Sequence, residues 1–341
     1  MSAAQPRSRA AATRRALVGA AWAAAWMLAW GSALMMFAHR AQAAPLTLAV
    51  SSGPVSLPIY VAESRGFFKD EQLDVRLREC ASGRECYQWL ADGSVDVATA
   101  AELVVATGSS LHRELAIIAT ISTSSSQIKL VARRGARLAE APQIRGKRVA
   151  TVPGSSAQYF LDNWLVFNDI DPQSVTLVPL GPDQMVKALE TRQVDAIAIW
   201  EPLASTAALA LGGAAVTFAS PRMYTQHFNL VSARATLERR DPDIARLLRA
   251  LMRAQRFIQA EPDAARALLA ERLHVEPLLA AAAMAGEDYR VRLDQSLVTT
   301  MQSEARWSAR NGHDLGDVDV LHAIDPAPLH RLDAAAVGLV Q

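Results

Sequence analysis

Motifs for cofactor chemistry are missing from this 341-residue sequence. It contains neither a Walker loop nor a G-x-G-x-x-G motif, which excludes the common phosphate-cradling and dinucleotide-binding loops. A G-x-S-x-G nucleophile motif starting at Gly154 fails at Gln158, which stands in place of its second glycine. The histidines after residue 43 do not have the spacing of metal ligands. We therefore expect no cofactor, no metal and no enzyme activity.

Cysteine is scarce as well, since Cys80 and Cys86 are the only two. An even number of cysteines favours a disulfide in an exported chain, and the N-terminus described next indicates export. The bridge would close a very short loop, so it would stabilise the fold by about 2–3 kcal/mol at most. A pair of free thiols is the alternative.

A hydrophobic run long enough to cross a membrane occurs only between residues 16 and 38. Four arginines precede the run, and Ala41-Gln42-Ala43 follows it as a small-x-small cleavage site. This order is typical of a secretory signal peptide over residues 1–43, with an uncleaved membrane anchor as the alternative. We expect cleavage near Ala43 and a periplasmic protein that is not inserted in the membrane.

No excess of positive charge remains once residues 1–43 are removed, because that segment holds five arginines and no acidic residue. The remainder has 30 basic and 34 acidic side chains, a net charge of −4. This balance does not suggest a nucleic-acid partner. A hydrophobic content of 51% indicates a globular protein, and the length allows two domains of about 100–200 residues each.

What the sequence does contain is a strand–loop–helix–strand pattern that occurs twice. Residues 48–53 (LAVSSG) open the first copy, and residues 149–154 (VATVPG) open the second. Asp96 and Asp195 lie at equivalent strand starts further along each copy, where we expect a structural role. The interpretation is an α/β fold with two similar lobes that face each other across a cleft. Helix N-termini lining such a cleft suit a small anionic ligand.

Two turns between a strand and a helix, at residues 51–54 and 154–156, are the strongest candidates for ligand contact. Free backbone N–H groups and serine hydroxyls at a helix start can hold an oxyanion without formal positive charge. Ordinary helix capping by the serines is the alternative. Both turns follow parallel strands, where ligands usually bind in such sheets. The candidates are Ser51, Ser52, Gly53, Pro54, Gly154, Ser155 and Ser156.

Other residues at strand ends and helix starts are weaker candidates. Trp200 can stack on a ligand and Glu201 can meet an amine, whereas packing at a lobe edge is the alternative for Trp200. The serine run at 122–126 offers hydroxyls to a ligand or forms only a polar loop. Core packing or capping competes with ligand contact for several of the rest. These further candidates are Tyr60, Ser82, Glu102, Ser124, Ser125, Tyr159 and Asn229.

An ordered series of short segments runs through the chain: residues 58–62 (PIYVA), 65–68 (RGFF), 73–75 (LDV), 92–98 (DGSVDVA), 144–149 (IRGKRV) and 194–202 (VDAIAIWEP). This series resembles the nitrate/taurine/alkanesulfonate solute-binding proteins of ABC importers, a group that includes receptors for thiamine-precursor pyrimidines. The resemblance covers about residues 46–256. It implies a type II periplasmic binding fold, in which two Rossmann-like lobes are joined by a hinge and hold the ligand in the cleft between them.

The resemblance also implies how the chain is divided and what it does. Lobe 1 would consist of residues 44–134, lobe 2 of residues 135–230, and residues 231–341 would complete lobe 1 and add C-terminal helices. The expected function is a monomeric receptor that passes a small anionic solute, such as a sulfonate, taurine or nitrate, to an ABC permease and its ATPase. A ligand-sensing protein is one alternative, and an enzyme that uses Ser155 or Ser156 in the same cleft is another.

Overall fold

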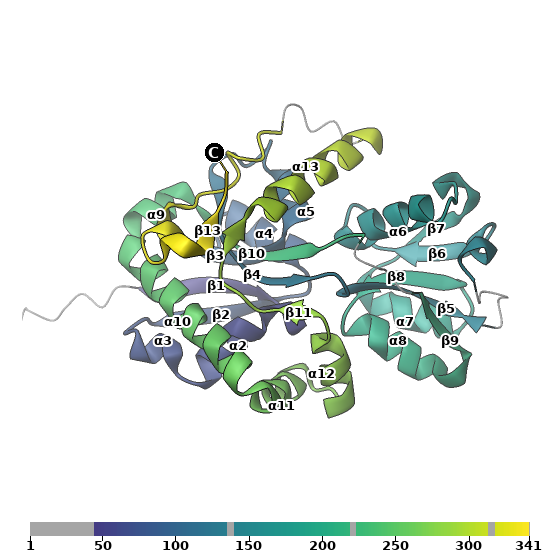
Figure 1. Cartoon of the computed structure of the whole chain (residues 1–341), viewed down its shortest axis with the longest axis horizontal. Helices are drawn as coiled ribbons and strands as arrows, with labels where there is room; N and C mark the ends of the chain where they lie inside the picture. Colours follow the sequence, from purple (N-terminus) through teal and green to yellow (C-terminus); the bar gives the residue numbers. More distant parts are fainter. Residues whose placement is uncertain (1–43, 135–139, 219–222, 313–317, 341) are drawn as a thin grey trace, which may run out of the picture. The chain divides into compact units, whose positions relative to one another are not determined.

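The computed structural model describes residues 44–134, 140–218, 223–312 and 318–340 (Figure 1). The predicted signal peptide, residues 1–43, lies outside the described residues. Within the described ranges, no helix combines the length and the apolar character that a membrane crossing requires. From residue 45 onward, the chain builds two main β-sheets with helices packed against them.

The first sheet has six strands in the order β11-β4-β10-β3-β1-β2. β1 pairs in parallel with β2 and β3, whereas β10 runs antiparallel to β3 and β4. Every residue of β3 and β4 is buried, which is the pattern of strands covered on both faces. The strands are β1 (Leu46–Ser51), β2 (Val75–Cys80), β3 (Val97–Ala101), β4 (Leu115–Ser124), β10 (Gln226–Ala233) and β11 (Glu287–Asp288).

The second sheet has five strands in the order β7-β6-β8-β5-β9. β6 pairs in parallel with β7 and β8, and β5 runs antiparallel to β8 and β9. The order β7-β6-β8-β5 therefore repeats the order β2-β1-β3-β10 of the first sheet, which confirms the predicted pair of similar α/β units. The strands are β5 (Ile128–Arg133), β6 (Arg148–Thr151), β7 (Thr176–Pro179), β8 (Ala196–Trp200) and β9 (Ala215–Phe218).

The two equivalent aspartates make the same contact in each sheet. Asp96, just before β3, accepts a hydrogen bond from the Thr47 backbone N–H (2.9 Å) and donates its own N–H to the Thr47 carbonyl (3.1 Å). Asp195, just before β8, makes the same two bonds with Arg148, at 3.0 and 2.9 Å. Each carboxylate therefore fixes the alignment of two parallel strands at their amino ends, as a structural residue would.

The chain changes sheets at places that differ slightly from the expected lobe boundaries. It passes from the first sheet to the second at residues 125–127 and is back in the first sheet at β10, so both crossings precede the boundaries expected at residues 134 and 230. The sequence pattern does not predict β10, because this strand mixes apolar with polar residues. His227, Asn229 and Ser232 are nevertheless buried there, and each side chain forms at least one hydrogen bond with another group of the protein.

Helices follow the parallel strands and pack on the sheets. The helices are α2 (Leu57–Ser64), α3 (Phe67–Asp70), α4 (Gly83–Ala91), α5 (Glu102–Gly108), α6 (Ser156–Phe167), α7 (Pro182–Glu190), α8 (Leu203–Leu211), α9 (Arg234–Arg239), α10 (Asp241–Ala260), α11 (Pro262–Leu273), α12 (Pro277–Met284), α13 (Gln295–Arg310) and α14 (Ala327–His330). A small separate pair joins β12 (Leu293–Asp294) to β13 (Val337–Gly338).

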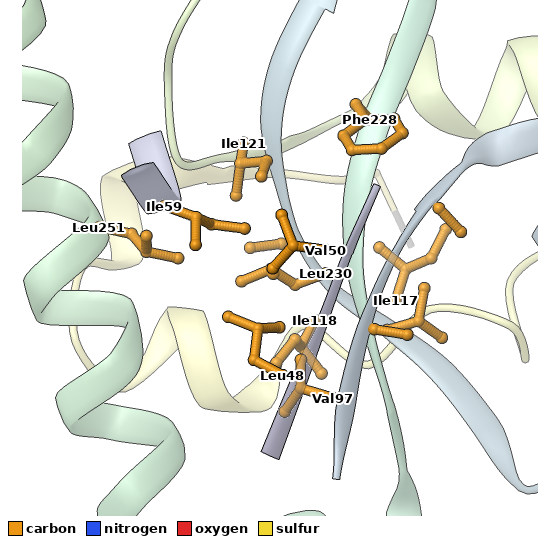
Figure 2. Close-up of a cluster of buried hydrophobic side chains, with 14 of the residues drawn as sticks. Leu48, Val50, Ile59, Val97, Ile117, Ile118, Ile121, Phe228, Leu230 and Leu251 are labelled. Atoms are coloured by element: carbon orange, nitrogen blue, oxygen red, sulfur yellow. The ribbon is translucent and has the colours of Figure 1, made fainter. Parts of the chain in front are cut away.

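The largest hydrophobic cluster lies on the first sheet. Figure 2 shows Leu48 and Val50 of β1 beside Leu230 of β10, with Ile59 of α2 and Leu251 of α10 packed against them. All five side chains are fully buried. Burial of each such side chain favours folding by about 1.5–3 kcal/mol, so this cluster holds β1 and the loop that follows it in place.

Helices α5 and α13 connect the first sheet to the core of the second. Leu103 of α5 and Trp307 of α13 belong to the hydrophobic cluster that surrounds Trp164 of α6. The Trp307 indole N–H donates to Asp162 of α6 at 2.8 Å. Because α5 also packs on β3 and β10, it is in contact with both sheets.

A buried pair of carboxyl groups lies at this contact. Glu102 of α5 and Glu304 of α13 are fully buried, and the Tyr224 hydroxyl donates to Glu102 Oε1 at 2.7 Å and lies 3.2 Å from Glu304 Oε1. Burial raises the pKa of Glu102 to about 7, although hydrogen bonds from Tyr224 and from backbone N–H groups favour its ionised form. Burial and the neighbouring Glu102 raise the pKa of Glu304 well above its ordinary value. The pair therefore retains at least one proton at neutral pH.

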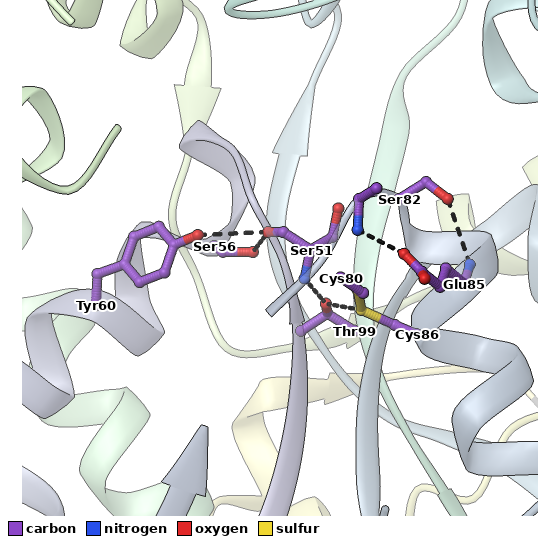
Figure 3. The surroundings of a disulfide bond; sticks show 9 residues. Ser51, Ser56, Tyr60, Cys80, Ser82, Glu85, Cys86 and Thr99 are labelled. Atoms are coloured by element: carbon purple, nitrogen blue, oxygen red, sulfur yellow. Dashed lines mark hydrogen bonds between the residues drawn. A yellow bond between two sulfur atoms is a disulfide. The ribbon is translucent and has the colours of Figure 1, made fainter. Parts of the chain in front are cut away.

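Cys80 and Cys86 form a disulfide, as the even cysteine count favours (Figure 3). The bridge joins the last residue of β2 to the first turns of α4. Cys86 Sγ lies 3.8 Å from the Thr99 hydroxyl, and that hydroxyl accepts the Ser51 backbone N–H at 2.9 Å. The bridge thus connects the start of α4 to the ends of β1, β2 and β3.

Removing the disulfide should destabilise the protein modestly. The double variant Cys80→Ala/Cys86→Ala should lose about 2 kcal/mol of unfolding free energy, because a short closed loop restricts the unfolded chain only slightly. Urea denaturation of residues 44–341 measures this loss. A reducing agent should lower the stability of the wild type by a similar amount and leave the variant unchanged; a wild type that is insensitive to reduction would contradict the assignment.

Raising the pH should weaken the fold through the Glu102–Glu304 pair. A carboxyl with a raised pKa in the folded state stabilises the fold fully below its ordinary pKa, and this contribution is lost as the pH rises through the folded pKa. For Glu102 the loss begins near pH 4.5, continues through about pH 7 and is on the order of 3 kcal/mol. Urea denaturation at pH 5 and pH 8 measures it.

The variant Glu102→Gln should show a much smaller decline, because the carboxyl that must ionise in the core is gone, and with it one cause of the raised pKa of Glu304. Glu238→Gln, at an exposed position of α9, is the matched control and should behave as the wild type does. Equal declines in Glu102→Gln and the control would contradict the prediction.

Candidate ligand-binding site

A cavity of about 130 Å³ lies where the parallel strands of both sheets end. All three parallel strands of each sheet contribute residues at or after their carboxyl ends, which is where ligands usually bind in α/β sheets. The lining residues are Ser51, Ser52, Gly53, Val55, Ser82, Gly83, Arg84, Ala101, Val104, Gln127, Val152, Ser155, Ser156, Pro182, Trp200, Glu201, Gln226 and Phe228.

The loop after β1 forms one wall of the cavity. Ser51 is buried, and its carbonyl accepts a hydrogen bond from the Ser56 hydroxyl at 2.7 Å, while the Tyr60 hydroxyl lies 3.5 Å from the same oxygen (Figure 3). Ser52 is exposed and Gly53 is buried beside it. The Ser51 carbonyl is thus turned toward the protein, which leaves Ser52 and Gly53 as the residues of this loop that face the cavity.

The start of α4 forms the adjacent wall. The Ser82 hydroxyl caps this helix by accepting the Glu85 backbone N–H at 3.3 Å. A Cβ atom at Gly83 would lie only 3.2 Å from the Ala100 Cα, so glycine lets the helix start approach the end of β3 closely. The first backbone N–H groups of α4 have no partner within the helix and are directed toward its N-terminal end.

Arg84 is the cationic residue at this helix start, and sequence reasoning missed it. Its guanidinium donates to the Gly154 carbonyl at 2.5 Å, which bridges from α4 to the turn between β6 and α6. Among the ion pairs of the described residues, none includes Arg84. Burial lowers the pKa of Arg84, but arginine remains protonated at neutral pH. The cavity wall therefore carries a positive charge without a carboxylate partner in the described part of the chain.

The start of α6 faces α4 from the second sheet. The Ser155 hydroxyl caps α6 by accepting the Ala157 N–H at 3.2 Å, and it donates to the Val152 carbonyl at 2.7 Å. The Gly154 N–H is bound to the Gln158 side chain at 2.8 Å. Ser155 and Ser156 line the cavity. Gly154 does not line it, but its carbonyl accepts the hydrogen bond from Arg84, which does. Both serine-capped helix starts, α4 and α6, thus direct their positive ends toward one cavity.

Trp200 and Glu201 close the cavity at the end of β8. Glu201 is almost completely buried and forms an ion pair with Lys129 of β5. The Ser205 hydroxyl and backbone N–H also donate to its carboxylate, at 2.7 and 3.0 Å. Because Lys129 neutralises Glu201, the carboxylate does not cancel the charge of Arg84.

The remaining walls are mainly apolar, with two amide side chains among them. Val55, Val104, Val152 and Phe228 supply aliphatic and aromatic surface. Gln127 Oε1 is buried and has no hydrogen-bond partner among the described residues. The site therefore combines a cationic, donor-rich side with an apolar side, which suits an anion that carries a hydrocarbon part.

Eight of the predicted site residues do not line the cavity, and the polar groups of most of them bond within the protein. Pro54 is buried and accepts the Tyr289 hydroxyl, Tyr60 lies in the first core, and Ser124 ends β4 with Ser125 after it. Asn229 bonds the Thr120 hydroxyl at 2.7 Å, and Tyr159 bonds Ser303 at 3.0 Å. The eight are Pro54, Tyr60, Glu102, Ser124, Ser125, Gly154, Tyr159 and Asn229.

The structure brings the other eight candidates together at the cavity. These are Ser51, Ser52, Gly53, Ser82, Ser155, Ser156, Trp200 and Glu201. Among the described residues, no group of three histidine, cysteine or acidic side chains is arranged to hold a metal ion.

Comparison with known proteins identifies one family and several similar proteins. The NMT1/THI5-like family model matches residues 53–265. A putative aliphatic sulfonates-binding protein of Bacillus subtilis (strain 168) is 24% identical over 202 residues, which covers 58% of this chain and 60% of that protein. The chain thus matches less than two thirds of the length of this relative.

Solved structures show the same fold at lower identity. The periplasmic aliphatic sulphonate binding protein SsuA of Escherichia coli has a TM-score of 0.72 and 18% identity, and the match covers 82% of this chain and 98% of that one. SsuA of Xanthomonas axonopodis pv. citri, bound to MOPS, has a TM-score of 0.72 and 19% identity, with 83% and 98% covered. The desulfurization enzyme DSZB also matches, with a TM-score of 0.62 and 16% identity over 84% of this chain and 98% of that one.

These likenesses identify the periplasmic binding protein fold, which receptors and at least one enzyme share. The family model spans more than half of the sequence. The chain therefore belongs to the NMT1/THI5-like family.

Proposed function

We propose that this protein is an extracytoplasmic receptor that binds a small organic anion, such as a sulfonate, and delivers it to an ABC importer. The observation that carries the proposal is the meeting of Arg84 with the N-termini of α4 and α6 at one partly apolar cavity. A sulfonate oxygen can accept hydrogen bonds from Arg84, from first-turn backbone N–H groups and from serine hydroxyls. The hydrocarbon part would lie against Val55, Val104 and Phe228.

The relatives support this ligand class. The Bacillus relative is named as a putative aliphatic sulfonates-binding protein, and one SsuA structure contains the sulfonate MOPS. Taurine shares the tetrahedral sulfonate group, and nitrate is a planar oxyanion whose oxygens can accept hydrogen bonds from the same donors. The apolar walls favour organic sulfonates over nitrate, because a small inorganic anion leaves this surface uncovered.

The proposal includes the route of the ligand and the place of the protein. Residues 1–43 would direct export and be cleaved near Ala43, which leaves a periplasmic monomer. The loaded form would be recognised by a permease and its ATPase, a role supported by two structural neighbours that are named as binding proteins of ABC-type transporters. Closure of the two sheets around the ligand would distinguish this form from the free receptor, and the Arg84–Gly154 hydrogen bond already joins the two sides of the cavity.

An enzyme in the same cavity is the second candidate, since DSZB shares the fold. Ser155 and Ser156 would be the nucleophiles. The Ser155 hydroxyl, however, donates to a backbone carbonyl, and no described hydrogen bond joins it to a histidine. A serine nucleophile requires a base within hydrogen-bond reach, so the geometry favours a receptor.

Binding should be detectable directly and should depend on Arg84. In thermal-shift and calorimetric titrations of residues 44–341, ethanesulfonate should stabilise the protein, by about 2.7 kcal/mol at 100 times its Kd. The variant Arg84→Gln should bind it about 10- to 100-fold more weakly, because a charge-assisted hydrogen bond to the anion is lost. Arg76→Gln, an exposed arginine of β2 outside the cavity, is the matched control.

Taurine, nitrate and acetate serve as competitors in the same titrations. A flat response to every anion, or equal affinities in Arg84→Gln and Arg76→Gln, would rule out the proposed mode of binding. Turnover of a sulfonate that disappears in Ser155→Ala would favour the enzyme instead.

A further inference from the structure

A second and larger hollow adjoins the cavity. Its volume is about 690 Å³, against about 130 Å³ for the cavity. We call it the outer groove and define it by Tyr87, Gln88, Leu111, His112, Gln158 and Trp307, which line it. It lies among α4, α5, α6 and α13. Its walls therefore include helices that pack on the first sheet and a helix, α6, that packs on the second.

Arg84 and Val104 line both hollows, so they form the boundary between them. The Arg84 side chain is held across this boundary by its hydrogen bond to the Gly154 carbonyl. A single hydrogen bond of this kind contributes little net free energy. The Arg84 side chain is also exposed, so it can turn toward a ligand anion without disturbing the core.

The cavity alone is small for an organic anion. A cavity of about 150 Å³ accommodates benzene, so about 130 Å³ holds a charged headgroup and a few carbon atoms. The rest of a longer ligand must therefore leave the cavity, and the outer groove adjoins it at the residue that would bind the headgroup.

The walls of the outer groove suit an apolar chain or ring. The rings of Tyr87 and His112 pack edge to face, with centroids 5.9 Å apart, and Leu111 beside them is 80% exposed. Trp307 and Val104 add further apolar surface. Apolar ligand atoms placed here would cover Leu111, which otherwise faces solvent.

Tyr87 provides a separate indication of a ligand. Only 4% of this residue is exposed, and its hydroxyl has no hydrogen-bond partner among the described residues. Buried hydroxyls are nearly always hydrogen-bonded. The Tyr87 hydroxyl lies against Gly108, which also lines the groove, so a small movement of this wall would open it to an acceptor on a ligand. Burial raises the pKa of Tyr87, so the hydroxyl keeps its proton and remains a donor.

We propose that the outer groove is a second subsite of the same ligand site, in which Arg84 divides the headgroup from the far end of the ligand. The ligand class is then an elongated organic anion with an apolar body and a hydrogen-bond acceptor at its far end. This inference rests on the proposed function, and it names the shape of the ligand that the receptor takes.

Calorimetric titration of residues 44–341 with linear alkanesulfonates of two to eight carbons tests the subsite. Once the chain exceeds the cavity, each further methylene should tighten binding about threefold to fourfold, because it becomes buried in the outer groove. The variant Gln88→Trp places an indole in the groove. It should bind ethanesulfonate as the wild type does and octanesulfonate at least about tenfold more weakly. Gln259→Trp, at an exposed position of α10 outside both hollows, is the matched control.

A second comparison tests the acceptor. MOPS has a ring ether oxygen at its far end, and its piperidine analogue has a methylene in that place. The wild type should prefer MOPS by about 3- to 10-fold, and Tyr87→Phe should bind the two equally, because the donor is gone.

The outcomes separate this inference from the proposed function. Ethanesulfonate binding without any gain for longer chains would overturn the subsite and leave the proposed function intact. Equal length dependence in Gln88→Trp and Gln259→Trp would also overturn it. A failure of every sulfonate to bind would overturn both.

Discussion

Parallel strand pairing is the constraint from which the candidate site follows. Parallel strands in one sheet end on the same edge, so the turns after β1, β2 and β3 lie together, as do those after β6, β7 and β8. Asp96 and Asp195 hold the amino ends of these strands in the same way in both sheets. The positive ends of α4 and α6 then face one cavity, and the disulfide holds the start of α4 against the sheet.

Charge at the cavity is arranged so that one cation is left for a ligand. Glu201 is the acidic residue on the cavity wall, and Lys129 and Ser205 satisfy its carboxylate. Arg84 is bound only to a neutral carbonyl in the described contacts, so an anion can replace that carbonyl without breaking an ion pair. The helix ends add partial positive charge on the same side. An organic anion thus meets complementary charge at one end and apolar surface at the other.

The sequence predicts those parts of the fold and site that depend on local pattern. The turns at residues 51–54 and 154–156 are recognisable because a strand, a glycine or serine turn and a helix follow one another directly. Arg84 was missed because an arginine in the first turn of a helix resembles any surface charge, although Ser82 and Gly83 just before it mark a helix start beside the site. Tyr159 and Asn229 were expected at the ligand because sequence does not reveal whether a polar side chain meets a cavity or a partner inside the protein. The buried strand β10 escapes prediction for the same reason.

A crystal structure of residues 44–341 grown with ethanesulfonate tests the central claim most directly. We predict that the sulfonate oxygens lie within hydrogen-bond distance of the Arg84 guanidinium and of backbone N–H groups at the starts of α4 and α6. The ethyl group should point toward Val104 and Phe228. A sulfonate bound elsewhere, or one held in the cavity without contact to either helix start, would contradict the account.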